Sequence, residues 1–222
     1  MNLIVFDMDG VLIDVSQSYN LAIKKTVEFF LGRIISMDTI NEFKSKPGMN
    51  NDWDCTEAIL RQFQTDVTRK VIIKKFQEYY LGRDFDGLIN NEKLLIKEDT
   101  LKKLSKKYLL AIFTGRPRKE AEYVLDKFKI IKYFMEIVSM EDVLLQKPNP
   151  EGLNKIMRKL DKSTAIYVGD SIDDLTAAKN AGIQFVGVIN PNGNKEVLNM
   201  LFKNNGAKQI LTNINDILKI KF

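Results

Sequence analysis

Short runs of apolar residues recur along the chain, and most of them do not alternate with polar residues. Unalternating, β-branched runs of this length are typical of strands that are buried on both faces of a parallel sheet. We expect strands at Leu3–Phe6, Leu109–Phe113, Glu136–Ser139, Ala165–Val168, Phe185–Ile189 and, as a weaker run, Gln209–Leu211.

Between several of these runs the apolar positions recur about every 3.6 residues, which is the period of a helix. This pattern predicts helices over Arg118–Phe128, Pro150–Leu160 and Ile172–Ala181. Gly182 follows the last of these and is a typical stop signal for a helix. The alternation of strands and helices predicts an α/β fold with a doubly wound, mainly parallel sheet, that is, a Rossmann-like core.

One long stretch, from about residue 16 to residue 83, contains no convincing strand pattern. It is typical of amphipathic helices, at Tyr19–Gly32, Thr56–Gln64 and Thr68–Leu81, with a turn at Pro47-Gly48. We therefore expect residues 1–15 and 88–222 to form the α/β core and residues 16–87 to form a helical cap domain. The alternative is a set of extra helices packed on the core sheet.

Composition excludes several classes of site. The 222 residues include no histidine, which excludes Ser-His-Asp and Cys-His nucleophile pairs and zinc sites built on histidine. The single cysteine, Cys55, cannot form an intramolecular disulfide, which fits a reducing compartment. The net charge of +5 favours anionic partners but is too small to predict nucleic-acid binding. Without a visible secretory or membrane segment, we expect a soluble, cytoplasmic monomer or homodimer with no membrane partner.

The polar residues that follow the predicted strands are the chemically informative ones, because ligands of open parallel sheets bind at the carboxyl ends of the strands. These residues are Asp7 and Asp9, Thr114-Gly115-Arg116, Lys147, and Asp170 with Asp173 and Asp174.

Crowded carboxylates repel one another unless a cation lies between them, and an all-oxygen set favours Mg²⁺. Thr114 and Lys147, with backbone amides near Gly10 and Gly115, would bind an anion beside that metal. This combination is suited to phosphoryl transfer. A calcium-binding EF-hand loop is excluded, because Val11 stands where that loop needs an acid or amide and Ser18 stands where it needs a glutamate.

These four segments resemble the four motifs of the haloacid dehalogenase superfamily, in chain order, spacing and strand context. The segments are Asp7-Met8-Asp9-Gly10-Val11-Leu12, Phe113-Thr114-Gly115-Arg116, Lys147-Pro148 and Gly169-Asp170 through Asp174. The resemblance is to phosphatase-type members with a small helical cap, in the branch of phosphoglycolate phosphatase and β-phosphoglucomutase.

The resemblance implies a role for each matching residue. Asp7 matches the nucleophile that forms an aspartyl-phosphate, and Asp9 matches the general acid and base. Thr114 and Lys147, with the backbone of Gly115, match the groups that hold the phosphoryl. Asp170 matches an Mg²⁺ ligand, together with Asp7 and the backbone carbonyl of Asp9. Asp174 would support the metal through water, although Asp173 could share that role.

The resemblance leaves the reaction and the substrate open. Asp9 disfavours carbon–halogen hydrolysis. Phosphonate cleavage would need a cap lysine, and nothing singles out one of Lys24, Lys25, Lys44 and Lys46. The favoured function is Mg²⁺-dependent hydrolysis of a small phosphomonoester metabolite. A sugar phosphomutase and a non-catalytic interaction protein with the same fold are the alternatives.

Specificity is expected to reside in the cap. The candidate substrate contacts are Asn50, Asn51 and Trp53, for which a helix cap with Trp53 packed inside the cap domain is the favoured alternative. Arg116 is a further candidate, for which a place in a basic turn without a substrate contact is favoured. Ser171 is interpreted either as a helix cap or as a site residue.

Overall fold

The protein is described by a computed structural model that covers residues 2–44, 46, 48–49, 51–189 and 195–220. It divides into two compact units, one formed by Met1–Asp14 with Leu94–Phe222 and the other by Val15–Lys93. Among the described residues, no helix is long and apolar enough to cross a membrane. The assignment of the second unit as a cap remains a prediction.

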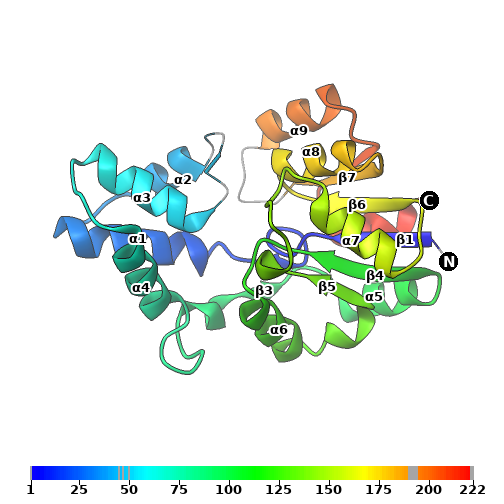
Figure 1. The fold of residues 1–222 in the computed structure, drawn as a ribbon, viewed down its shortest axis with the longest axis horizontal. Coiled ribbons are helices and arrows are strands. Elements are labelled where there is room, and N and C mark those ends of the chain that lie inside the picture. Colours follow the sequence, from blue (N-terminus) through cyan, green and yellow to red (C-terminus); the bar gives the residue numbers. More distant parts are fainter. Residues whose placement is uncertain (1, 45, 47, 50, 190–194, 221–222) are drawn as a thin grey trace. The chain divides into compact units, whose positions relative to one another are not determined.

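The first unit is built on a six-stranded parallel sheet with the strand order β5-β4-β1-β6-β7-β8 (Figure 1). A further two-stranded sheet of β2 and β3 lies where the chain leaves and re-enters this unit. The strands are β1 (Asn2–Phe6), β2 (Ile13–Asp14), β3 (Lys93–Leu94), β4 (Tyr108–Phe113), β5 (Glu136–Val138), β6 (Ala165–Gly169), β7 (Gln184–Val188) and β8 (Gln209–Leu211).

Helices cover both faces of the six-stranded sheet, as Figure 1 shows. Helices α7, α8 and α9 pack on the face that carries Leu3, Val5, Phe113 and Tyr167, and α5 contacts β4 from the other face. The helices of this unit are α5 (Glu98–Ser105), α6 (Arg118–Lys127), α7 (Glu151–Lys159), α8 (Ile172–Asn180) and α9 (Lys195–Asn204), with short 3₁₀ turns at η2 (Ile131–Tyr133), η3 (Met140–Asp142) and η4 (Ile214–Lys219). The predicted doubly wound α/β fold is confirmed.

The central strands are apolar on both faces because both faces are covered. Leu3, Ile4, Val5 and Phe6 of β1 all have exposed fractions of 1% or less. Helix α8 ends as expected, because Gly182 takes the left-handed conformation (φ 69°) directly after the C-cap residue Ala181.

The second unit is helical and has its own core. It contains α1 (Tyr19–Leu31), α2 (Met37–Lys44), α3 (Asp52–Gln62), α4 (Arg69–Tyr80) and the short η1 (Leu88–Asn91). Helix α1 contacts both α3 and α4, and the rings of Tyr19 and Tyr80 stack with centroids 4.3 Å apart. The buried carboxylate of Glu92 accepts hydrogen bonds from the hydroxyls of Ser18 (2.9 Å) and Tyr80 (3.0 Å).

Candidate active site

Three adjacent strands bring the predicted site residues to one edge of the sheet. Asp7 follows β1, and the neighbouring strands β4 and β6 lead to Thr114 and Asp170. Chain crossovers leave β1 in opposite directions, so its carboxyl end is the switch point at which open α/β sheets bind ligands. The backbone N–H of Asp7 donates to the carbonyl of Val168 (2.8 Å), which fixes the start of the loop.

Three carboxylates meet at this switch point. Asp7, Asp170 and Asp174 each offer an oxygen, and these oxygens all lie within 4.8 Å of one another. Asp7 and Asp174 are buried. Within the described part of the chain, the group includes neither Asp173 nor the side chain of Asp9. The sequence left Asp173 and Asp174 as alternatives, and it is Asp174 that the fold places beside Asp7.

Lys147 lies inside this group. Its ammonium donates to Oδ1 of Asp7 at 2.6 Å and lies 2.8 Å from Oδ1 of Asp174. The same nitrogen lies 5.0 Å from the ring centroid of Phe113 and 5.5 Å from that of Tyr167. Two carboxylates and two aromatic faces therefore hold a buried cation at one point.

The pKa values of the group reflect burial and crowding. Burial raises the pKa of Asp7 to about 7, with the Asp174 and Asp9 carboxylates adding to the shift and the Lys147 ammonium opposing it. Burial also raises the pKa of Asp170 well above its usual range, as do the charges of Asp7 and Asp174. Burial opposes ionisation of Asp174 too, but Lys147, Ser171 and Tyr167 outweigh it and hold the pKa of Asp174 below its usual value.

The donor set fits a divalent cation. Three ionised carboxylates and one ammonium would carry an excess of two negative charges, and the raised pKa values of Asp7 and Asp170 indicate that this excess is disfavoured. A hard dication with oxygen ligands would balance the charge. Asp7 and Asp170 are the carboxylates best suited to hold it, because Asp174 is already engaged by protein donors.

Asp174 joins the site to the start of α8. Its Oδ2 accepts from the hydroxyl (2.6 Å) and backbone N–H (3.1 Å) of Ser171, and its Oδ1 accepts from the hydroxyl of Tyr167 (2.7 Å). The Ser171 hydroxyl in turn accepts from the Asp174 backbone N–H, which completes a capping box. Of the two interpretations of Ser171, the structure shows the helix cap.

Gly10 allows the loop after β1 to approach Asp170. Its φ is +70°, a conformation that glycine adopts without the steric cost of a side chain. A Cβ atom at this position would lie 1.9 Å from Oδ2 of Asp170. Gly10 is thus required on both conformational and steric grounds, a role that the sequence analysis did not assign to it.

Arg116 is not a solvated turn residue. Only 2% of the residue is exposed, and its Nε donates to Oδ1 of Asp9 at 2.6 Å. Arg116 lies in the turn after β4, as favoured, but this turn buries its side chain, and a contact with substrate remains a prediction. The one signal in the sequence is that Arg116 follows a predicted strand end, where sites form, whereas its run with Arg118 and Lys119 does not distinguish a buried arginine from an exposed one. Thr114, also buried, accepts from the backbone N–H of Arg116 through its Oγ1 (3.1 Å). Gly115 leaves open space where a side chain would lie.

The candidate substrate contacts of the second unit lie at the start of α3. Asn51 caps this helix, since its Oδ1 accepts from the backbone N–H groups of Trp53 (2.9 Å) and Asp54 (3.1 Å). Trp53 is half-buried. Asn50 and Pro47 lie outside the described residues. The helix cap is confirmed, and contacts of Asn51 and Trp53 with a substrate remain predictions.

The lysines considered for phosphonate cleavage are mostly engaged in local ion pairs. Lys24 pairs with Glu28, Lys44 with Asp52 at 2.7 Å, and Lys46 with Glu42 at 3.1 Å. None of these three pairs places an amine in the buried, desolvated environment that lowers a lysine pKa for Schiff-base chemistry.

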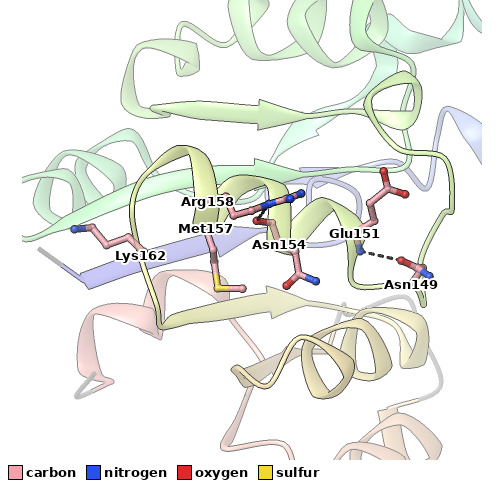
Figure 2. A pocket seen from close by; sticks show the side chains of 6 residues that line it. All are labelled: Asn149, Glu151, Asn154, Met157, Arg158 and Lys162. Carbon is pink, nitrogen blue, oxygen red and sulfur yellow. Dashed lines mark hydrogen bonds between the residues drawn. The ribbon is translucent and has the colours of Figure 1, made fainter.

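A hollow of about 590 Å³ runs along α7 (Figure 2), and none of the residues that line it belongs to the carboxylate group. Its polar atoms serve local structure: the backbone N–H of Glu151 donates to Oδ1 of Asn149 (3.0 Å), and Nε of Arg158 donates to the carbonyl of Asn154 (3.3 Å). The residues that line it are Asn149, Glu151, Asn154, Met157, Arg158 and Lys162. Because it contains none of the strand-end residues, the switch point is the better candidate for chemistry.

Two known proteins with similar sequences illustrate the range of relatives. A protein of Phytophthora nicotianae named imidazoleglycerol-phosphate dehydratase is 32% identical over 197 residues, which are 85% of this chain and 43% of that protein. The chain spans less than half of that relative, so the likeness does not extend to the whole dehydratase. A phosphoglycolate phosphatase of Vibrio parahaemolyticus is 27% identical over 198 residues, 85% of this chain and 83% of its own.

A solved structure and a family model are also similar to this chain. The crystal structure of a predicted phosphoglycolate phosphatase from Haemophilus somnus 129PT superimposes with a TM-score of 0.81 at 23% identity, covering 99% of this chain and 97% of that chain, which confirms the fold. The family model described as haloacid dehalogenase-like hydrolase matches residues 4–188, a span that contains every strand-end residue of the site. With strand order, carboxylate group and family model in agreement, the chain belongs to the haloacid dehalogenase-like hydrolases.

Proposed function

We propose that this chain is an Mg²⁺-dependent phosphatase that hydrolyses a small phosphomonoester through an aspartyl-phosphate on Asp7. The observation that carries the proposal is the buried carboxylate of Asp7, which is held by Lys147 and crowded by Asp170 and Asp174. The phosphatase names of relatives, such as the Vibrio phosphoglycolate phosphatase, support the same class of reaction.

Asp7 and Asp170 would hold Mg²⁺, with the backbone carbonyl of Asp9 as a further ligand. Bound there, the metal would neutralise negative charge on the phosphoryl oxygens and on Asp7. Lys147 would bind a phosphoryl oxygen and keep Asp7 ionised. The hydroxyl of Thr114 and the N–H of Gly115 would bind other phosphoryl oxygens, as preorganised donors at the place where charge develops.

The reaction would proceed in two proton-balanced halves. An Asp7 oxygen attacks phosphorus while the ester bond breaks, and Asp9 gives its proton to the departing alcohol oxygen. Asp9, now a carboxylate, takes a proton from water as the water oxygen attacks phosphorus and releases Asp7. General acid–base help of this kind contributes roughly 10²–10⁴-fold to such a step.

A phosphate-release screen over a panel of phosphorylated metabolites, in the presence of Mg²⁺, tests the proposal. We expect release from at least one small phosphomonoester, and we expect Asp7→Asn to abolish it. Mass spectrometry of the intact chain should show one added phosphoryl group in the Asp9→Asn variant and none in Asp7→Asn. Turnover that survives in Asp7→Asn would rule out the covalent mechanism.

The same screen separates the alternatives. A phosphomutase would convert a sugar phosphate into its isomer with little free phosphate, which chromatography of the products detects. A non-catalytic protein would release no phosphate from any member of the panel.

A further inference from the structure

Arg116 is a large charged side chain that the fold encloses almost completely. Only 1% of its side chain is exposed, and it ranks with Tyr80 and Tyr167 among the largest fully buried side chains. Burying a guanidinium is costly unless it is paired, so its partner explains its position. An apolar side chain would fill the same space without that cost.

One partner of Arg116 is Asp9, and this contact involves a single oxygen of the Asp9 carboxylate. Nε of Arg116 donates to Oδ1 of Asp9 (2.6 Å), and the NH2 nitrogen lies 2.5 Å from the same oxygen as an ion pair without hydrogen-bond geometry. Oδ2 of Asp9 has no hydrogen-bond partner among the residues that the structure describes. Arg116 thus anchors one oxygen of Asp9. The carboxylate still reaches solvent, since 33% of the Asp9 side chain is exposed.

The backbone of Arg116 is held on both sides. Its N–H donates to Oγ1 of Thr114 (3.1 Å), and its carbonyl accepts from the N–H of Met140 (2.9 Å). The turn after β4 thus determines where the guanidinium points. A planar guanidinium with fixed donors orients a carboxylate better than the flexible point charge of a lysine would.

We propose that Arg116 is the positioning residue of Asp9: it holds Oδ1, so that Oδ2 is the atom that transfers the proton. This inference rests on the proposed phosphatase function and assigns a new residue to it. In the first half-reaction, the proton leaves Oδ2 for the ester oxygen as the bond from phosphorus to that oxygen breaks and the bond to Asp7 forms.

In the second half-reaction, Oδ2 takes a proton from water as the water oxygen bonds to phosphorus and the bond to Asp7 breaks. Arg116 keeps its charge and all its protons throughout. Its contribution is to restrict the orientation of the Asp9 carboxylate, since a misplacement of about 1 Å can slow a catalysed step by 10²-fold.

The test compares two leaving groups in the first turnover, measured by rapid quench with Mg²⁺ present. Phenolate is a poor leaving group that needs a proton, whereas p-nitrophenolate leaves with little help. We expect Arg116→Met to slow release from phenyl phosphate by roughly 10²-fold and release from p-nitrophenyl phosphate by about 3-fold or less. In an Asp9→Asn background, Arg116→Met should add no further loss, because the two changes remove the same proton transfer.

Arg118→Met is the matched control. Arg118 lies two positions further along the chain, but it pairs with Asp142 and Glu122 rather than with Asp9. Its replacement should change both substrates equally and by little. Equal losses on both substrates in Arg116→Met, or losses that add to those of Asp9→Asn, would overturn the proposal and leave Arg116 with a packing role.

If Arg116→Met does not fold, Arg116→Lys takes its place in the test, because lysine keeps a cation at the buried position. We expect its loss on phenyl phosphate to exceed its loss on p-nitrophenyl phosphate at least 5-fold, since a single ammonium cannot fix the carboxylate plane. Equal losses would again overturn the proposal. A wild-type protein that releases no phosphate from any ester would instead contradict the proposed function itself.

Discussion

The ammonium of Lys147 donates a 2.6 Å hydrogen bond to Oδ1 of Asp7, and fewer than a tenth of each side chain is exposed. The burial penalty that raises the pKa of Asp7 would otherwise lower that of Lys147, but the carboxylates of Asp174 and Asp7 outweigh it and raise the pKa of Lys147. Each member of the pair thus favours the charged form of the other, although burial still leaves the pKa of Asp7 at about 7.

Lys147→Met is expected to abolish turnover and to lower the free energy of unfolding by about 3–5 kcal/mol, the usual cost of leaving a buried charge without its partner. Urea unfolding at pH 8 with excess chelator measures the loss. Added Mg²⁺ should restore part of it by supplying the missing positive charge. Unfolding at the wild-type urea concentration would contradict this account.

Asp7→Asn is expected to gain stability relative to the wild type as the pH rises from 4 to 8 in chelator. The pKa of Asp7 is about 7 in the folded chain, whereas the ordinary value of an aspartate is 3.8. The protonated Asp7 of the wild type therefore stabilises the fold below pH 4, and this contribution is lost as the pH rises through 7. Asparagine does not titrate and avoids that loss. Urea unfolding at several pH values measures the difference.

Asp142→Asn is the control of opposite sign. The burial that would raise the pKa of Asp142 is outweighed by hydrogen bonds from the hydroxyl and N–H of Ser139 and by Arg118, so its pKa is lowered. A carboxylate of this kind stabilises the fold above its ordinary pKa and loses that contribution as the pH falls through its folded value. The stability deficit of Asp142→Asn should therefore shrink toward pH 3, and an unchanging deficit would refute the interpretation.

Activity is expected to require Mg²⁺ and to be suppressed by Ca²⁺. Mg²⁺ holds strict octahedral geometry, whereas Ca²⁺ accepts more oxygen ligands and could engage Asp7 through both oxygens. That would turn the attacking lone pair away from phosphorus. Phosphate release at rising Ca²⁺ with fixed Mg²⁺ measures the effect, and full turnover in excess chelator would exclude a metal-dependent mechanism.

Gly10→Ala is expected to weaken Mg²⁺ binding at least 10-fold, equivalent to about 1.4 kcal/mol, because the new Cβ would lie 1.9 Å from Oδ2 of Asp170. Gly182→Ala is its matched control: Gly182 has nearly the same φ of +69°, with nothing within 4 Å of the added Cβ. Calorimetric titration with Mg²⁺ compares the two variants. Equal weakening in both would assign the effect to backbone strain alone.

Trp53→Ala tests the expected role of the second unit in substrate recognition. If Trp53 contacts the leaving group, kcat/KM for the substrate found in the screen should fall roughly 10-fold or more, while p-nitrophenyl phosphate should be hardly affected. Equal losses on both substrates with a lower melting temperature would favour a packing role. Unchanged kinetics on the true substrate would remove Trp53 from the site.

The sequence predicted the strand-end residues well because buried parallel strands have a distinctive pattern. Unbroken apolar runs ended directly before Asp7 and Thr114 and one residue before Asp170, and the topology then had to bring those ends together. The last strand, Gln209–Leu211, was found with its observed bounds in spite of its weak pattern.

The sequence analysis missed helices α2, α5 and α9, which are short or lack a long apolar repeat. Helix α3 begins at Asp52 rather than at Thr56, because its cap, Asn51, lies before the apolar positions. The burial of the Arg116 side chain was not predicted, because a basic run has the same sequence pattern whether its first arginine is exposed or buried. Only the position of Asp9 in three dimensions distinguishes the two.

Strands β1 and β4 pair in register, Asn2 with Tyr108, although the whole unit Val15–Lys93 lies between them in the chain. The entropy cost of closing a flexible loop grows only with the logarithm of its length, by about 0.6 kcal/mol per doubling. The pairing of β2 with β3 brings the two ends of that insertion together. If the insertion folds first, the flexible loop that remains to be closed between β1 and β4 is shorter. We therefore expect the rate at which Asp7 and Thr114 come together to depend on a helical unit that supplies neither of them.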